Sequence, residues 1–200
     1  MFRKKTKRNR PVGTKGNSMA IFKQDRTIEQ IRGLQFEVWC EKLFKQLGYL
    51  HVRRNVKYYQ NGTYRQVDLE YFKYLSLFNH FVILEMKYSG NGMVGLKHHF
   101  NGKKKKKSQK IGTIDNIVVE LEERRKFVNA DTAILVTNNY FQKDLKKEAG
   151  KYNIELYDRD VLTELDKKRI LSFWKRKPIN QQIRSVNWKK YQHTQYTEKL

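Results

Sequence analysis

The first folded stretch of the chain has apolar residues at helical spacing. Five of them lie three or four positions apart or side by side on one face: Phe36, Cys40, Leu43, Phe44 and Leu47. Gly48 follows, and glycine often ends a helix because it adopts a left-handed conformation without strain. The pattern predicts a helix over residues 27–47, with Cys40 packed in the core.

A β-rich stretch follows this helix. Residues 50–59 and 64–72 flank Asn61-Gly62, the dipeptide that most strongly signals a tight hairpin turn. Residues 80–88 form a third and more apolar stretch of strand type. The pattern predicts three consecutive strands, the first two of which form a hairpin.

Beyond residue 90, a loop without apolar periodicity is followed by a second series of predicted helices and strands. Glycines and the run from Lys103 to Lys107 predict a basic loop without a regular element. The order of all predicted elements is α-β-β-β-α-β-α-β-α, which indicates an α/β protein with helices packed on a central sheet. The later elements are a helix over residues 113–127, a strand over 132–137, a helix over 143–152, a strand over 154–157 and a helix from Asp158 or Asp160 through Leu165.

The elements indicate one folded domain with two extensions. Residues 1–26 are expected to be a disordered basic arm, and residues 27–166 form the domain. Residues 167–200 form a basic C-terminal extension whose last part is too polar to assign to an element. Its aromatic residues interleave with Lys and Arg, which suits either stacking of unpaired bases or packing of a helix on the core or on a second subunit.

The charge of the chain is concentrated in three stretches. The sequence has 43 Lys and Arg against 20 Asp and Glu, a formal net charge of +23. Residues 1–16, 97–110 and 167–190 contain no acid and carry seven, seven and nine basic residues, so the rest of the chain is balanced. Basic segments on a neutral core predict a polyanionic partner such as DNA, with solubility as the alternative explanation.

Other compositional features narrow the class of protein. Cys40 is the single cysteine, so no internal disulfide is formed and a reducing, cytoplasmic compartment is expected. No apolar stretch approaches the roughly 18 residues that cross a bilayer, and no membrane partner is expected.

Acidic and basic side chains interrupt two of the predicted strands. Glu85 and Lys87 point to the same face as Ile83, and Asp68 lies among apolar residues in the partner strand. The alternative is that these strands simply leave the core and become solvated.

A pair of buried acids has a physical consequence. Two carboxylates about 4 Å apart repel by roughly 4 kcal/mol at an effective dielectric constant of about 20, which a divalent cation relieves. Mg²⁺ prefers oxygen ligands and phosphate, and a neighbouring lysine can orient water or offset charge on the phosphate. The acids Asp68 and Glu85 with Lys87 therefore suit metal-dependent hydrolysis of a phosphodiester.

The same residues resemble a known family. Asp68 followed by Glu85-Met86-Lys87 is similar to the D…(E/D)-x-K signature of the PD-(D/E)XK nucleases, whose restriction-endonuclease-like core has a mixed central sheet flanked by helices. Residues 33–37 (GLQFE) with residues 47–49 (LGY) resemble the first helix of Mrr-type catalytic domains, in which the Glu, here Glu37, often completes the metal site.

The resemblance extends downstream and covers residues 28–166. Residues 133–138, Ala149 and residues 154–158 resemble the later strand, helix and strand of Mrr-type domains. It implies a DNA endonuclease that uses Mg²⁺ or Mn²⁺, with Asp68, Glu85 and Glu37 as metal ligands and with these three residues and Lys87 as the catalytic set.

Two departures from the family pattern keep other functions open. Only a short basic arm precedes the core in this sequence, so the recognition of methylated sites that a separate DNA-reading domain would supply is not expected. Residues 64–67 (YRQV) replace the glycine-rich approach to the Asp. Similar cores occur in Holliday-junction resolvases, which are small, basic and dimeric, so a structure-selective resolvase and a homodimer are alternatives. A non-catalytic nucleic-acid-binding or packaging protein is the alternative from another class.

The lysines of residues 97–110 and the acid Glu70 are interpreted from the residues around them. The lysine-rich loop is expected to contact DNA phosphates without reading sequence. Glu70 is interpreted as a solvated surface acid one step beyond the site. The residues expected to bind nucleic acid are Lys97, Lys103, Lys104, Lys105, Lys106, Lys107 and Lys110.

Overall fold

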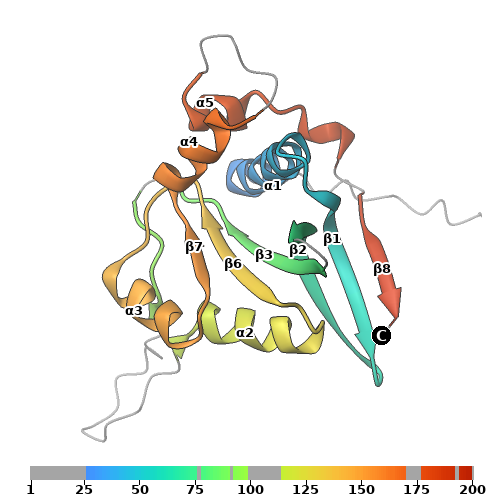
Figure 1. The fold of residues 1–200 in the computed structure, drawn as a ribbon. Helices are drawn as coiled ribbons and strands as arrows, with labels where there is room; N and C mark the ends of the chain where they lie inside the picture. Colours follow the sequence, from blue (N-terminus) through green and yellow to red (C-terminus); the bar gives the residue numbers. More distant parts are fainter. Residues whose placement is uncertain are drawn as a thin grey trace, which may run out of the picture.

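A mixed sheet with helices on both faces forms the body of the protein (Figure 1). The computed structural model describes residues 26–75, 78–90, 92–98, 114–169, 177–191 and 194–199. The predicted N-terminal arm up to residue 25 and the lysine run Lys103 to Lys107 lie outside the described residues.

Six strands form the sheet in the order β7-β6-β3-β2-β1-β8. The first three strands of the chain are an antiparallel meander, and β6, β7 and β8 each run parallel to a neighbour. A separate two-stranded sheet pairs β4 with β5. The strands are β1 (Leu50–Gln60), β2 (Thr63–Leu75), β3 (Phe78–Lys87), β4 (Lys97–His98), β5 (Ile114–Asp115), β6 (Thr132–Thr137), β7 (Glu155–Tyr157) and β8 (Tyr196–Lys199).

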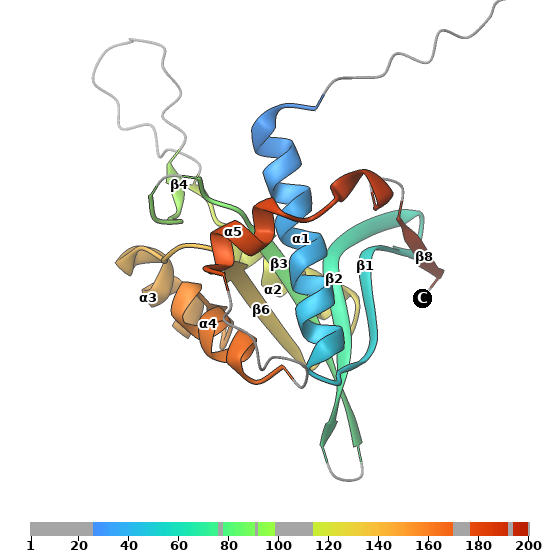
Figure 2. The same ribbon diagram turned by 90° about the horizontal axis from the view of Figure 1, so that it is seen from above.

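Helices cover both faces of the six-stranded sheet, as the two views in Figures 1 and 2 show. Buried side chains of α1, α4 and α5 belong to one hydrophobic cluster, and those of α2 and α3 belong to another. The helices are α1 (Ile28–Gln46), α2 (Ile117–Phe127), α3 (Lys143–Lys151), α4 (Arg159–Lys167) and α5 (Ile179–Arg184), and a short 3₁₀ helix, η1, spans Trp188–Lys190.

Strand β3 connects the two clusters through its alternating side chains. Leu84 and Met86 pack in the α1 cluster, whereas Ile83 packs in the α2 cluster. This is the alternation that the sequence predicted. It places Glu85 and Lys87 on the α2 face of the central strand.

Local signals in the sequence account for several element boundaries. Thr27 and Gln30 form a capping box at the start of α1, and Gly48 follows its end at a φ of +84°. Asn61 and Gly62 both have positive φ in the β1–β2 turn. The predicted hairpin, the first helix and the burial of Cys40 are confirmed.

Two predictions about the region around residues 90–116 were wrong. Residues 97–98 were expected to lie in a loop without regular structure, but they pair with residues 114–115 as a short antiparallel ladder. The second helix was expected from residue 113 and begins at Ile117, because the Asn116 side chain accepts the N–H groups of Val118 and Val119 and caps it.

The C-terminal extension, which the sequence left unassigned, packs against the domain in its described part. Ile179, Ile183 and Val186 are buried in the α1 cluster. Gln35 of α1 donates from Nε2 to the carbonyl oxygens of Arg184 and Val186, at 3.1 and 2.9 Å. The extension then adds β8 to the free edge of β1. No helix in the described part of the chain is both long and apolar enough to cross a membrane.

Candidate active site

Asp68 lies where the pairing of β2 with β3 ends. The last recorded pair between these strands joins Leu69 to Leu84. At the next residue, Asp68, a side-chain hydrogen bond joins the two strands in place of a main-chain one. The Oδ2 atom of Asp68 accepts the N–H of Met86 at 2.8 Å. The contact fixes the Asp68 side chain beside the Glu85–Lys87 segment of β3.

Strand β2 also changes the face on which it packs at this point. Leu69 belongs to the α1 cluster and Val67 to the α2 cluster, although residues two apart in a regular strand share a face. Asp68 therefore lies between the two layers of helices. The Asp68 carboxylate is therefore influenced both by Glu37 of α1 and by Glu85 on the α2 face of β3. A side chain in a regular strand points to one face only.

Glu85 is held by two cations on the α2 face. Its carboxylate pairs with Arg124 of α2 and with Lys87, whose Nζ lies 2.7 Å from Glu85 Oε1. Glu85 is 4% exposed, whereas the Lys87 side chain is 43% exposed. The carboxylate is thus buried and neutralised, and the lysine beside it is accessible to a ligand.

Glu37 approaches from α1 and is held by a buried arginine of β1. Arg54, which is fully buried, lies 3.3 Å from both Glu37 Oε2 and Glu41 Oε2. Its Nη2 also donates to the carbonyl oxygen of Tyr191 at 2.8 Å. One guanidinium therefore ties α1 and β1 to the C-terminal extension.

The pKa values show that the acids influence one another. Burial, followed by the negative charges of Glu85 and Glu37, raises the pKa of Asp68 well above its usual range. Burial also raises the pKa of Glu37, against the opposing effect of Arg54. For Lys87, burial acts to lower the pKa, but the charge and hydrogen bond of Glu85 outweigh it and the pKa is raised. The three acids therefore repel one another, and the cations Arg54, Arg124 and Lys87 offset part of their charge.

This charge distribution suits a divalent cation, although the acids are partly engaged. Among the residues that the structure describes, no three acidic, histidine or cysteine side chains form a ready metal cluster. Arg54 holds Glu37, while Arg124 and Lys87 hold Glu85. Asp68 and Glu85 supply hard oxygen donors whose mutual repulsion a cation would relieve, so the donor chemistry fits Mg²⁺ or Mn²⁺.

Other residues singled out in the sequence have different positions. The lysines of the loop, Lys103 to Lys107 and Lys110, lie outside the described residues, and only the backbone of Lys97 is described, in β4. The interpretation of Glu70 as a solvated acid was wrong. Glu70 is fully buried, because it accepts hydrogen bonds from Tyr58 Oη at 2.6 Å and from Arg53 Nε at 2.8 Å.

Neither arginine of the site, Arg54 or Arg124, was among the residues predicted from the sequence. A signal for Arg54 was present, because it alternates with Val52 and Val56, and this period of two predicts a buried position in β1. A buried arginine at such a position requires acidic partners. Arg124 has no comparable signal, since a basic residue in the last turn of a helix is ordinary and only the packing of α2 on β3 brings it to Glu85.

Comparisons with known proteins found one matching family and two solved structures with a similar fold. Residues 28–165 match the Mrr catalytic family, described as restriction endonuclease. Among solved structures, AF1548, a protein of unknown function, is 17% identical with a TM-score of 0.47, and the alignment covers 66% of this chain and 65% of that chain. VC1899 from Vibrio cholerae is 18% identical with a TM-score of 0.43, covering 66% of this chain and 30% of that one.

The chain therefore spans less than two thirds of the length of either similar structure. The comparison with curated proteins found no significant match. The C-terminal elements α5, η1 and β8 lie beyond the family match, which ends at residue 165.

Proposed function

Because the chain belongs to the Mrr-type restriction endonuclease domains, part of the PD-(D/E)XK-like nucleases, we propose that it is a metal-dependent DNA endonuclease that hydrolyses phosphodiester bonds. The observation that carries this proposal is the position of Asp68 beside the Glu85–Lys87 segment, fixed by the hydrogen bond from Met86 to Asp68. Two acids and an accessible lysine meet where the pairing of β2 with β3 ends, and this is the set that such hydrolysis requires.

In this proposal, Asp68 and Glu85 would hold Mg²⁺ or Mn²⁺, and Glu37 would complete the ligand set. When bound, such a cation polarises a phosphoryl oxygen and lowers the pKa of a coordinated water. Arg124 compensates the charge of Glu85 and fixes the position of its carboxylate. Glu37 has the least freedom to act as a ligand, because Arg54 competes for its carboxylate.

Lys87 acts as a cationic donor in this arrangement. Its raised pKa keeps the amine protonated at neutral pH, so it donates a hydrogen bond to the attacked phosphate or to water. The charge that builds on the phosphate during attack is then offset at short range. A role as the general base is disfavoured, because the neighbouring Glu85 stabilises the ammonium form.

The basic stretches would supply affinity for the DNA backbone. Lys97, Lys110 and the run Lys103 to Lys107 follow the catalytic strand closely in sequence, so they can contact phosphates on either side of the cleaved bond. Contacts to phosphate carry no base information, and this part of the binding should be independent of sequence.

Incubation with plasmid, linear duplex and a four-way junction tests the proposed activity. With Mg²⁺ or Mn²⁺ we expect nicked and linear plasmid products, and with EDTA we expect none. Preference for the four-way junction would select the resolvase alternative. Binding without any cleavage in either metal would contradict the proposal and select a non-catalytic nucleic-acid-binding protein.

Thermal melting tests the metal site without an activity measurement. Mg²⁺ should raise the melting temperature of the parent, because a ligand that binds only the folded state stabilises it. Asp68→Asn should lose most of this shift and should melt higher than the parent in EDTA, since it removes a repelling charge. About 1 kcal/mol corresponds to roughly 2–4 °C for a chain of this size.

The matched control for melting is Asp131→Asn. Asp131 also accepts a main-chain N–H of β3, that of Phe81 at 2.7 Å, but it lies at the other end of the strand. This variant should keep the parental shift with Mg²⁺. Equal shifts for the parent and Asp68→Asn would remove Asp68 from the metal site.

A further inference from the structure

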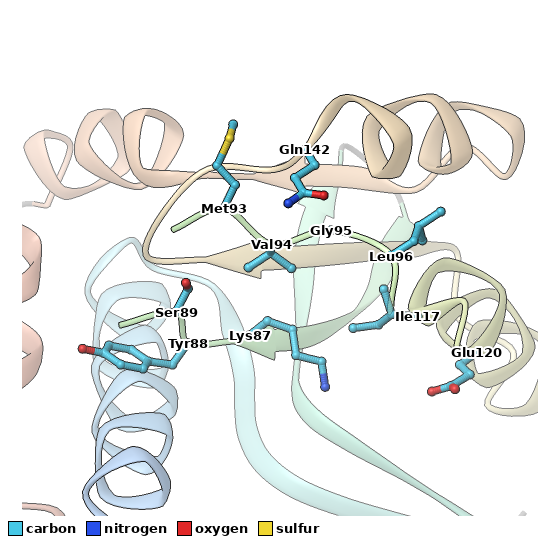
Figure 3. Close-up of a pocket in the computed structure, with 10 residues that line it drawn as sticks. All are labelled: Lys87, Tyr88, Ser89, Met93, Val94, Gly95, Leu96, Ile117, Glu120 and Gln142. Atoms are coloured by element: carbon cyan, nitrogen blue, oxygen red, sulfur yellow. The ribbon is translucent and has the colours of Figure 1, made fainter. Parts of the chain in front are cut away.

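A cavity of about 470 Å³ opens beside Lys87, and apart from this lysine its lining residues take no part in the chemistry described above (Figure 3). Its base is formed by the residues at and after the end of β3. One wall is the chain from Met93 to Leu96, and the other is the first turn of α2. Its volume falls within the range of about 300–1,000 Å³ that is typical of small-ligand sites.

The wall from Met93 to Leu96 is held in place by main-chain contacts. The N–H of Val94 donates to the carbonyl oxygen of Tyr140, and the N–H of Gln142 donates to the carbonyl oxygen of Val94, both at 2.8 Å. A parallel bridge joins Val94 to Phe141. The wall is therefore anchored to the segment that links β6 to α3.

Gln142 presents an unused amide to the cavity. It occupies the N-cap position of α3, yet its side chain makes no capping hydrogen bond. No hydrogen bond of its carboxamide to another residue is recorded within the described part of the chain, and Figure 3 shows the group directed over the chain at Gly95. A Cβ at Gly95 would lie 2.0 Å from Gln142 Oε1, so this glycine makes room for the amide.

The lining combines apolar walls with a few polar groups. Val94, Leu96 and Ile117 offer aliphatic surface, whereas Gln142 and Glu120 offer hydrogen-bonding groups. Glu120, whose carboxylate lies 3.8 Å from Arg124, disfavours a phosphate beside it, and a purely apolar ligand would leave the Gln142 amide unpaired. A nucleobase has apolar faces and a polar edge with amino groups, so it matches both parts of the lining.

We propose that this cavity receives an unstacked nucleobase from the nucleotide beside the cleaved phosphate. The proposal rests on the proposed nuclease function and adds a substrate class to it. Lys87 lines the cavity and also belongs to the candidate active site, so a base in the cavity and a phosphate at Lys87 can belong to adjoining parts of one strand. Gln142 and Glu120 would contact the edge of the base.

The preferred substrate is then DNA with an unpaired nucleotide at the cut. A base within an intact duplex is stacked and must be extruded before it can enter a pocket. An unpaired or bulged base avoids most of this penalty. We expect the parent to cut a duplex with a single bulged nucleotide at least about tenfold faster than the fully paired duplex.

Two variants test whether the cavity causes this preference. Ile117→Trp fills the cavity and should bring the ratio of the two cleavage rates close to one, with cutting of the paired duplex retained. Gln142→Ala removes the amide and the methylene that carries it, and it should lower the ratio severalfold without a change in folding. The matched control is Glu123→Trp, which adds the same side chain at an exposed position of α2 and should keep the parental ratio.

Binding in EDTA separates this proposal from the nuclease function. The fluorescence of a bulged 2-aminopurine should increase when the parent binds, because the base leaves its stacked neighbours. The increase should be smaller with Ile117→Trp. Bound DNA, shown by anisotropy, without any change in emission would overturn the pocket proposal, as would a cleavage ratio unchanged in both variants. An increase in fluorescence without cleavage in Mg²⁺ or Mn²⁺ would support the base-binding cavity and contradict the proposed nuclease function.

Discussion

Changing Asp68 to Asn, Glu85 to Gln or Lys87 to Ala is expected to slow DNA cleavage by at least about a hundredfold. The first two changes remove a charge that would hold the metal, and the third removes the ammonium beside the attacked phosphate. DNA binding should persist in all three, because the basic stretches of the chain lie elsewhere. Single-turnover cleavage and gel-shift binding measure the two properties separately.

Asp131→Asn provides the control for these variants, as it makes the same chemical change at the other end of β3. Its cleavage rate should equal that of the parent. Glu37→Gln should fall between the control and the three central variants, since Arg54 already engages this carboxylate. A central variant that cuts DNA at the parental rate would exclude that residue from the site.

Replacing Arg54 by Met should destabilise the protein by about 3–5 kcal/mol, because buried carboxylates lose their cationic partner. Arg54 is completely inaccessible and lies between Glu41, Glu37 and the carbonyl oxygen of Tyr191. Methionine fills similar space but offers no donor. Unfolding in urea, followed by fluorescence of the tryptophans, measures the change in the free energy of unfolding.

Lys45→Ala is the control for Arg54, because it removes an exposed partner of the same Glu41. The Lys45 side chain is 52% exposed and pairs with Glu41 at 2.6 Å, so its loss should cost at most about 1 kcal/mol. Should Arg54→Met fail to fold, Arg54→Lys keeps the charge and tests the geometry, since one ammonium cannot reach all three acceptors. Equal stabilities of the Arg54 and Lys45 variants would contradict the assignment.

Arg54 also connects the proposed site with the C-terminal extension. The family match ends at residue 165, whereas the contact with Tyr191 and the burial of Ile179 and Ile183 involve later residues. The extension packs on α1, the helix that carries Glu37. In this chain, therefore, the described part of the extension packs on an element of the Mrr-type domain.

Much of the fold was determined by local patterns in the sequence. The alternation in β3, the Asn61-Gly62 turn and the Thr27 cap each depend on a few neighbouring residues, and the structure places the corresponding elements close to their predicted bounds. The spacing of Glu85 and Lys87 likewise put both on one face of a strand. Such features follow from backbone geometry and so can be inferred without knowing the fold.

Only the tertiary structure decided which distant groups meet. Glu70 becomes buried because Tyr58 and Arg53 of the neighbouring strand supply its hydrogen bonds. Arg124 reaches Glu85 because α2 packs across β3. The helix α5 and the strand β8 are six and four residues long, too short for a periodic signal, and they are stabilised by packing on α1 and pairing with β1. Their positions depend on surfaces that exist only once the domain has folded.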